Sequence, residues 1–379
     1  MLKIAIIGCG KIADQHVLAM QRIADCKLVA VCDNEPLMAG QLAERFGRPA
    51  CFSDVGKMLT EVRPDVVHIT TPPQSHFSLG KQCLEAGCHV YLEKPFTVNA
   101  PEAEDLVRLA QQLKRKLTAG HNLQFTLEML EMRRLVSRDF LGGKAVHIES
   151  HFPYSLEDMT YVGPLLGNRQ HWVRRLPGGL FHNIVSHGFA KLAEFMDDDM
   201  DEVIATAHQS ALLKRLGGQE LMDELRVTLR DRSGTTAFFC FSTGIRPGLN
   251  QLRIYGPKNS MLVDHGSGSL IRLENRSSKS YLGYVLPPLR LASEYARCAF
   301  RNFGAFLSRR LHQDSGMKEL IERFYESVRT DGPPPIPYRE ILWTARIMDA
   351  VFASIQPRET GPATRSEPQS TAKPLTLGS

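Results

Sequence analysis

KIAIIGCGKIA, residues 3–13, decides the fold, because it joins an apolar run to a glycine turn and then to a predicted helix. The run KIAII predicts a buried strand, and residues 14–25 predict a helix. Gly8, Gly10 and Ala13 have the G-x-G-x-x-G/A spacing, which in this strand–turn–helix context indicates dinucleotide binding. The alternative is a glycine turn that binds nothing, and the acid described below makes that alternative the weaker one.

Each residue of this turn has a physical role in the predicted site. Gly8 permits the tight turn, Gly10 lets the backbone approach a pyrophosphate, and Ala13 keeps the helix close to the strand. The helix N-terminus offers the N–H groups of Lys11 and Ile12 to the anion. The turn therefore predicts a pyrophosphate site.

An acid follows at the position that the ribose of the cofactor requires. The predicted strand 27–33 ends at Asp33, which lies 20 residues after Ala13. A carboxylate at this place hydrogen-bonds the ribose 2′-hydroxyl of NAD. Asn34 and Glu35 come next, with no arginine to bind the 2′-phosphate of NADP. The sequence therefore predicts NAD as the cofactor and favours it over NADP.

Strands and helices alternate through the first part of the chain. The apolar strands after the first two are expected at 65–71, 89–94 and 116–121, and the helices at 36–47, 75–87 and 101–115. Such alternation implies right-handed crossovers and an α/β doubly wound parallel sheet. We assign residues 1–122 to this Rossmann dinucleotide-binding domain.

The pattern changes after residue 122. Segments with alternating apolar residues are separated by turn signals, and they predict strands at 144–152, 203–210, 224–231, 235–242, 251–256, 260–264 and 269–273. Helices are expected at 126–138, 185–196, 317–329 and 338–354. We predict an α+β domain over 123–356 with a large, mainly antiparallel open sheet. Residues 357–379 are rich in Pro, Ser and Thr and are expected to be a disordered tail.

Composition narrows the class of protein. The 379 residues are 43% apolar and 23% charged, which excludes a disordered, collagen-like or coiled-coil chain. The net charge of +5 is too weak to imply a nucleic-acid partner. No leader peptide or membrane-spanning run is recognisable, so we expect a cytoplasmic protein. The eight cysteines have no paired spacing, which predicts reduced thiols and no metal site.

Two further motifs follow predicted strands of the first domain. Thr71 and Pro72 follow one strand, with His76 close behind, and Glu93-Lys94-Pro95 follows the next. Ligands of open α/β sheets bind beyond the carboxyl ends of the strands, so Lys94 is expected to face the cofactor. The alternative is an ordinary solvated lysine at a strand end.

A third motif lies at 169–187 (RQHWVRRLPGGLFHNIVSHGF read on to residue 189). A glycine pair at 178–179 indicates a close approach of the backbone to a neighbouring group. Helical spacing then puts Asn183 and His187 on one face, four residues apart. We favour a functional role for His187 over a purely structural one, because it shares this face with another polar residue.

These motifs together resemble those of the Gfo/Idh/MocA family of oxidoreductases. The resemblance covers about residues 1–356 and rests on GCGKIA, TPPQSH, EKP and the later Trp…Gly-Gly…His segment. It implies an N-terminal Rossmann domain and a C-terminal domain with a large open sheet. It also implies NAD(P)-dependent oxidation or reduction of sugars, nucleotide sugars or cyclitols, by a homodimer or homotetramer assembled through that sheet.

The resemblance also implies roles for single residues. Lys94 matches the lysine that contacts the substrate hydroxyl and the nicotinamide, and His187 matches the catalytic histidine that accepts the proton. A histidine suits proton transfer near neutral pH, and an ammonium group suits a developing alkoxide. Asn183 stands where the family commonly has Asp, so it cannot support an imidazolium by charge. The remaining expected cofactor contacts follow the same motifs: Thr71, Pro72, His76, Glu93 and Asn122.

The loop before the glycine pair gives a hint about the substrate. Trp172 could stack on a sugar or base, and Arg174 and Arg175 could bind a phosphate or carboxylate. This would favour a nucleotide sugar or sugar acid over a free hexose. A solvated basic loop explains the same residues equally well.

Residues 287–311 predict an amphipathic helix that is long for its place in the family. Its basic face carries Arg290, Arg297 and Arg301, and the opposite face carries apolar residues such as Tyr295 and Phe303. Such a helix could lie on an anionic membrane surface. We favour ordinary packing against the sheet or a neighbouring subunit.

Three functions remain compatible with the sequence. The favoured one is an NAD-dependent dehydrogenase acting on a secondary alcohol of a small carbohydrate. The others are an NAD-dependent glycosidase of the same fold and a non-catalytic NAD-binding sensor, the latter suggested by Asn183.

Overall fold

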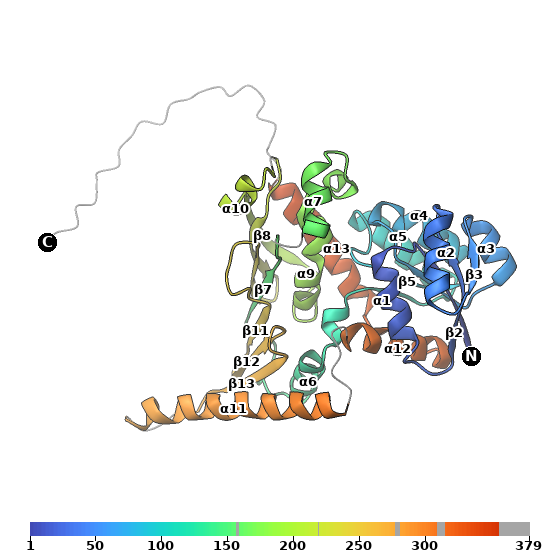
Figure 1. The fold of residues 1–379 in the computed structure, drawn as a ribbon. Coiled ribbons are helices and arrows are strands. Elements are labelled where there is room, and N and C mark those ends of the chain that lie inside the picture. Colours follow the sequence, from blue (N-terminus) through green and yellow to red (C-terminus); the bar gives the residue numbers. More distant parts are fainter. Residues whose placement is uncertain (157–158, 219, 277–280, 309–314, 356–379) are drawn as a thin grey trace, which may run out of the picture.

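The computed structural model describes residues 1–156, 159–218, 220–276, 281–308 and 315–355. Two sheets lie side by side, with helices α9 (Ser186–Ala193) and α13 (Tyr338–Ile355) between them (Figure 1). The predicted tail at 357–379 lies outside the described residues. The domain boundaries at 122 and 356 stay predictions.

Sheet A is the parallel sheet of a Rossmann fold. Its order is β3-β2-β1-β4-β5-β6, and its neighbouring strands all pair in parallel. The strands are β1 (Leu2–Ile7), β2 (Cys26–Cys32), β3 (Ala50–Phe52), β4 (Val66–Ile69), β5 (His89–Leu92) and β6 (Leu117–Ala119). The predicted doubly wound topology is thus confirmed, and all strands end at the same edge, where ligands of such sheets bind.

The crossover helices agree with the prediction, with one addition. They are α1 (Lys11–Met20), α2 (Pro36–Arg45), α3 (Val55–Val62), α4 (His76–Glu85) and α5 (Ala100–Gln112), with a 3₁₀ turn at Pro73–Ser75. The sequence analysis missed β3 and α3. Strand β3 has only three residues, too few for a periodic pattern, while α3 is marked by Asp54, which caps it by accepting from Lys57 N–H.

Sheet B has the order β13-β12-β11-β7-β10-β9-β8. Its strands are β7 (His147–Pro153), β8 (Met200–His208), β9 (Glu224–Asp231), β10 (Thr236–Ser242), β11 (Gln251–Tyr255), β12 (Asn259–Asp264) and β13 (Ser269–Glu274). The pair β7–β10 is parallel and the other pairs are antiparallel, which confirms a mainly antiparallel sheet.

The remaining helices differ in detail from the prediction. They are α6 (Leu127–Val136), α7 (Met159–Gly167), α8 (Gly179–Ile184), α9, α10 (Ala211–Arg215), α11 (Leu282–Leu307), α12 (Ser315–Thr330) and α13, with 3₁₀ turns at Asn122–Phe125 and Trp172–Arg175. The helix expected at 185–196 is α9, preceded by the short α8. Helices α7 and α10 were not predicted.

Two hydrophobic cores stabilise the fold, and the chain crosses between them three times. The second core joins sheet B to α8, α9 and much of α13. The first core joins sheet A to its helices and also takes in α12, through residues such as Leu320, Phe324 and Tyr325. The C-terminal segment therefore returns to the Rossmann part and packs against α1.

On an anionic membrane the basic side of α11 was expected to face outward, but in the structure this side faces the protein. Arg297 and Arg301 point into the protein and pair with Glu131 on α6, so they do not face outward as a basic surface would. The helix packs on β13 through this side, as the favoured alternative predicted. Its apolar side, which includes Tyr295 and Phe303, is exposed instead.

The eight cysteines form no disulfide in the structure, and their redox state in the cell stays a prediction. All eight are free thiols, and only Cys51 is exposed and Cys26 half-buried. Burial, assisted by the nearby Asp33 charge, raises the pKa of Cys9 to about 12, so this thiol in the glycine turn is unreactive. Among the described residues no helix has the length and hydropathy needed to cross a bilayer.

Candidate functional site

The predicted cofactor residues meet at the carboxyl edge of sheet A. Gly8 donates its N–H to Cys32 O at 2.8 Å, which joins the turn after β1 to the end of β2. Its φ of +91° is accessible to glycine at little cost. A Cβ on Gly8 would lie 2.7 Å from Thr71 Cγ2 and 2.9 Å from Thr70 C. Gly8 is therefore required by the fold itself.

Gly10 has a different environment. It is the N-cap of α1 with extended backbone, and no side chain caps this helix. A Cβ placed on Gly10 would meet no atom within 4 Å. The open space beside the first turn of α1 fits a pyrophosphate, because an anion there would interact favourably with the N-terminal end of the helix dipole.

The two glycines give a matched pair of substitutions. Gly8→Ala should destabilise the protein by ~2–4 kcal/mol, because the positive φ and the clash with backbone act together. Gly10→Ala should change stability by less than ~1 kcal/mol and weaken NAD binding at least ~10-fold, because the methyl group would occupy the approach to the pyrophosphate. Thermal unfolding and calorimetric NAD titration check both. Equal loss of stability in the two variants would contradict the assignment.

Asp33 lies directly after β2, where its carboxylate organises the turn. Oδ2 accepts the N–H of Cys9 at 2.7 Å, and Oδ1 accepts the N–H of Glu35 at 2.9 Å. The side chain is half-buried, and each oxygen retains a second lone pair for a hydroxyl donor. This geometry is compatible with the predicted ribose contact.

Asp33→Ala should weaken NAD binding ~5- to 150-fold, which corresponds to the ~1–3 kcal/mol of a charged hydrogen bond in a partly buried site. The neighbouring Glu35→Ala is the control, and it should leave the dissociation constant within ~2-fold because that side chain is exposed and does not cap α2. The measurement is calorimetric titration with NAD and NADP. Unchanged NAD affinity in Asp33→Ala would refute the ribose assignment.

His76 connects the two loops that follow β4 and β5. Its Nε2 lies 2.9 Å from Thr71 O, and its Nδ1 lies 3.0 Å from Pro95 O and 3.2 Å from Phe96 O. Both ring nitrogens are thus engaged with the backbone. Any contribution of His76 to cofactor binding would be indirect, through the placement of Thr71 and of the loop after Lys94.

Glu93 is the end of a buried chain of hydrogen bonds that the sequence analysis missed. Tyr325 OH lies 2.8 Å from His68 Nε2, His68 Nδ1 lies 2.8 Å from His16 Nδ1, and His16 Nε2 lies 2.9 Å from Glu93 Oε1. Burial alone would raise the pKa of Glu93, but the His16 hydrogen bond and the Lys94 charge lower it on balance. Glu93 is therefore a carboxylate, and it anchors the backbone N–H of Lys94 at 3.2 Å.

Lys94 links the two halves of the site. Its peptide bond to Pro95 is cis, and its Nζ donates to the backbone oxygen of Asn183 on α8 at 3.2 Å. Burial lowers the pKa of Lys94, while the Glu93 carboxylate opposes the shift. The lysine from the Rossmann part thus reaches the helix that carries the second predicted motif.

Asn183 and His187 lie on the same side of a nearly continuous helical segment. Val185, between α8 and α9, keeps right-handed helical angles (φ −72°, ψ −14°), so the four-residue spacing still puts both side chains on one face. Both are half-buried, whereas their neighbours Ile184 and Ser186 are buried. The structure therefore brings Lys94, Asn183 and His187 together.

The electrostatic environment keeps His187 neutral. Burial lowers its pKa well below the usual 6.5, and the positive charge of Lys94 lowers it further. Its Nδ1 is buried and has no hydrogen-bond partner among the described residues, and its ring lies 5.9 Å from that of Phe152. A neutral imidazole with an unengaged nitrogen can accept a proton from a bound alcohol.

Two neighbours of His187 were not predicted. The ring of His121 lies 6.1 Å from that of His187, and its Nε2 is also buried without a partner among the described residues. Lys191 is fully buried one helical turn after His187, and burial lowers its pKa to about 7. The four-residue spacing from His187 to Lys191 was a signal in the sequence that could have identified Lys191.

The predicted substrate loop is close to the Rossmann part but more structural than expected. Gln74 donates to Trp172 O at 2.9 Å, which ties the loop to the segment after β4. Arg174 donates its Nε to Leu165 O at 2.9 Å and lines a pocket with Arg169 and Leu176 that does not include Lys94 or His187. Arg175 is exposed. Substrate binding by these residues stays a prediction.

The glycine pair and Asn122 also have structural explanations. A Cβ on Gly178 would lie 2.4 Å from the Phe352 ring, so the expected close approach is to α13. The backbone oxygen of Asn122 would lie 2.3 Å from a Cβ on Gly316, which brings α12 against this turn. The Asn122 side chain is half-buried, and its contact with the cofactor stays a prediction.

Two family models match the chain. The Gfo/Idh/MocA model described as an oxidoreductase family with an NAD-binding Rossmann fold matches residues 2–121. The Gfo/Idh/MocA C-terminal domain matches residues 129–262. These matches confirm the predicted fold class and the predicted cofactor class.

Related proteins carry carbohydrate-dehydrogenase names. D-glucoside 3-dehydrogenase of Escherichia coli (strain K12) is 36% identical over 37% of this chain and 40% of its own length. Inositol 2-dehydrogenase of Rhizobium meliloti (strain 1021) is 25% identical over 76% of this chain and 82% of its own. The WlbA dehydrogenase from Bordetella pertussis, solved with NADH and UDP-GlcNAcA, shares the fold with a TM-score of 0.75 at 18% identity, covering 93% of this chain and 95% of that one.

Proposed function

Because the chain belongs to the Gfo/Idh/MocA family of NAD-binding oxidoreductases, we propose that it transfers a hydride between NAD and a secondary alcohol of a sugar, nucleotide sugar or cyclitol. The observation that carries this proposal is the convergence of Lys94, from the Rossmann part, with Asn183 and His187 at one site. The names of the relatives support a carbohydrate substrate.

The residues divide the chemistry between them. When bound, NAD accepts the hydride from the substrate carbon. His187, kept neutral by burial and by nearby cations, takes the hydroxyl proton. The Lys94 ammonium stabilises the negative charge that develops on the substrate oxygen, and the Glu93 carboxylate keeps this lysine in position.

Asn183 changes how this site handles the proton. An aspartate four residues before the histidine would stabilise an imidazolium and raise its pKa, whereas an amide has no charge to do so. His187 is therefore a weaker base than a histidine beside an aspartate, and the reaction depends more on the Lys94 cation to stabilise the oxygen as the proton leaves.

The structural support for a particular substrate class is less direct than the support for the reaction. Trp172 and Arg175 are not fully buried, so they are available to a nucleotide or a sugar acid beside the site. We also propose a cytoplasmic location, which the free thiols support. We further propose that the protein forms a homodimer or homotetramer through sheet B.

The test is an absorbance assay for NADH with a panel of UDP-sugars, sugar acids and cyclitols. NADH formation with one class supports the dehydrogenase and identifies its substrate. Release of free sugar from glycosides without net NADH would instead indicate the glycosidase. Tight NAD binding with no turnover across the panel and the glycosides would indicate the sensor.

A further inference from the structure

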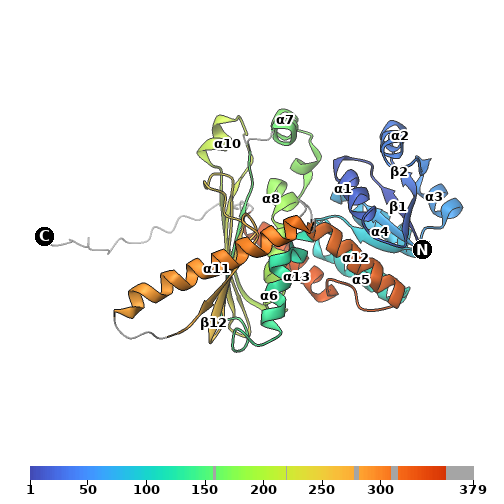
Figure 2. The same cartoon turned by 60° about the horizontal axis from the view of Figure 1, so that its bottom comes forward.

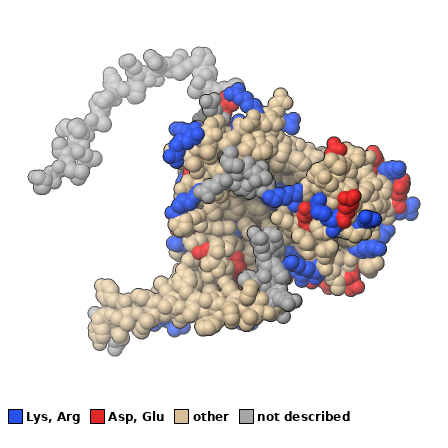
Figure 3. All heavy atoms as spheres, in the orientation of Figure 1, with Lys and Arg blue, Asp and Glu red and all other residues tan. Residues whose placement is uncertain are grey.

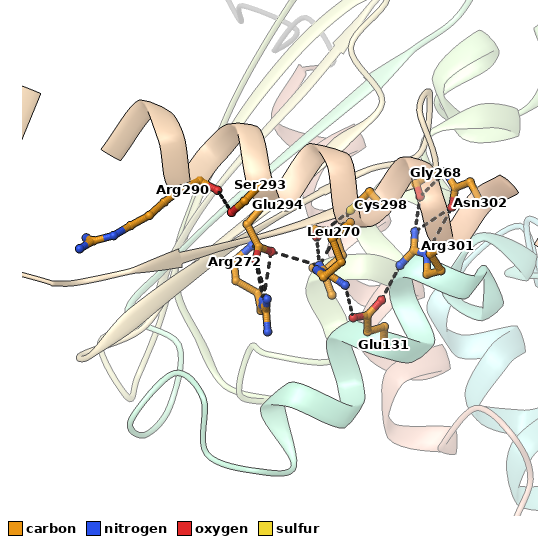
Figure 4. A network of polar contacts seen from close by, with 11 residues as sticks. Glu131, Gly268, Leu270, Arg272, Arg290, Ser293, Glu294, Cys298, Arg301 and Asn302 are labelled. Atoms are coloured by element: carbon orange, nitrogen blue, oxygen red, sulfur yellow. Dashed lines mark hydrogen bonds and ion pairs between the residues drawn. The ribbon is translucent and has the colours of Figure 1, made fainter. Parts of the chain in front are cut away.

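Helix α11 places all its charged residues on one side. They are Arg290, Glu294, Arg297 and Arg301, spaced so that they share one face of a helix. Arg297 donates to Glu131 Oε1 at 2.9 Å and to Leu270 O at 2.8 Å, and Arg301 also pairs with Glu131. Figure 4 shows Arg301 directed at Glu131, whereas Arg290 extends away from this network. The charged side of α11 thus holds the helix on the protein.

The other side is uncharged and exposed. At 100° per residue the charged face occupies about a third of the circumference, which leaves an apolar arc of roughly two-thirds. Large side chains on it are more than half exposed: Tyr284 87%, Val285 53%, Leu289 60%, Tyr295 51%, Phe300 78%, Phe303 60%, Phe306 65% and Leu307 66%. Figure 3 shows the viewed side of the helix as a nearly uninterrupted uncharged surface.

This surface is larger than a monomer ordinarily leaves in water. The 26 residues of α11 span ~39 Å, and contiguous apolar patches on monomers seldom exceed a few hundred Å². The N-terminal part of the helix also extends beyond sheet B, as Figures 1 and 2 both show. We therefore expect the apolar arc of α11 to contact another molecule or a membrane when the protein functions.

The charge of α11 and its flanking sequence indicates what contacts the apolar arc. Counted on the sequence alone, residues 276–310 contain seven Lys and Arg and one acid, a net charge of +6, against +5 for the whole chain. The rest of the chain therefore sums to −1. Three of the seven cations are paired with acids, Arg276 with Glu274 and both Arg297 and Arg301 with Glu131, so the attraction rests on Arg290 and the cations counted in the flanking sequence. An anionic lipid surface attracts these charges, whereas two copies of the segment would repel each other.

The width of the apolar arc favours the same occupant. A single neighbouring helix covers a stripe of about 100°, which would leave much of this arc in water. A lipid interface accepts a helix along its whole length, with aromatic rings at the level of the headgroups. Tyr281, Tyr284 and Tyr295 have the amphipathic rings that suit this position.

We propose that α11 lies in the interface of an anionic phospholipid membrane, with its apolar arc immersed and its charged face packed on the protein. The helix does not cross the bilayer. The protein is then a peripheral membrane protein, and its cofactor site stays in the aqueous phase. This inference does not depend on the identity of the substrate.

The first test is co-sedimentation of the full chain with vesicles. Vesicles containing phosphatidylglycerol should pellet most of the protein, and vesicles of phosphatidylcholine alone should pellet less. Phe300→Ser combined with Phe303→Ser should reduce binding at least ~10-fold, because two exposed rings lose their place in the lipid. The control is Leu37→Ser combined with Ile204→Ser, two side chains that are equally exposed outside α11 and should leave binding unchanged.

A second measurement separates lipid binding from self-association. Phe303→Trp adds a reporter on the arc, and its emission should shift to shorter wavelength with anionic vesicles, whereas Leu37→Trp should not respond. Light scattering of wild type and of the Phe300→Ser, Phe303→Ser variant should give the same mass. No vesicle binding by the wild type, or a smaller assembly in the variant alone, would overturn the proposal and indicate a second copy on α11.

Discussion

Lys94→Ala should lower turnover by ~10²–10³-fold, because it removes the cation that stabilises charge on the reacting oxygen. The affinity for NAD should change much less, by under ~5-fold, since the pyrophosphate and ribose contacts lie on other residues. Within the part of the chain that the structure describes, the Lys94 ammonium donates to the backbone oxygen of Asn183 alone, so its loss should leave the helix intact. Steady-state kinetics measure the turnover, and titration with NAD measures the affinity.

The control for Lys94→Ala is Lys81→Ala, an exposed lysine on α4 that should behave as wild type. Lys94→Met is the volume-matched variant and should lose as much turnover as the alanine variant. If turnover and NAD affinity fell by the same factor, Lys94 would be a cofactor anchor, and the assignment to the reacting oxygen would be wrong.

His187→Gln should reduce turnover by ~10²–10⁴-fold, because it removes the group that accepts the proton. The pH profile is the sharper readout. Alcohol oxidation requires the neutral imidazole, so the rate falls as the pH drops through the pKa of His187. Because burial and Lys94 lower that pKa well below 6.5, wild-type activity should persist into the acid range.

Asn183→Asp separates a base from a merely structural histidine. The added carboxylate should stabilise the imidazolium and raise the pKa of His187, so the acid limb of the profile should move to higher pH. The distant Asn34→Asp adds the same charge beside the cofactor turn and should leave the limb in place. An acid limb that stays fixed in Asn183→Asp would show that His187 does not titrate in catalysis.

The candidate site residues could be predicted from the sequence where they belong to a motif of closely spaced residues. The turn with Gly8 and Gly10, the acid Asp33, and the positions of Lys94 and His187 all follow from patterns within one or two elements. The structure adds a contact between the two motifs, because Lys94 reaches Asn183 across 89 positions of sequence. No local pattern could give that contact.

The features that were missed depend on tertiary structure. The chain from Tyr325 through His68 and His16 to Glu93 joins four distant segments, so no motif announces it. The side of α11 that faces the protein could not be predicted, for the same reason. The basic and apolar sides are evident in the sequence, but the inward orientation of the arginines depends on their contact with Glu131 on α6, a distant helix.

The most direct test follows the hydride itself. Substrates of the responding class, deuterated on their ring carbons, are incubated with NAD and the wild-type protein, and the nicotinamide product is examined by mass spectrometry. We expect deuterium to accumulate in free NADH at least ~100-fold faster with wild type than with Lys94→Ala or His187→Gln, although both variants bind NAD. Product formation without deuterium in the nicotinamide pool, or equal transfer by all three proteins, would contradict the proposed mechanism.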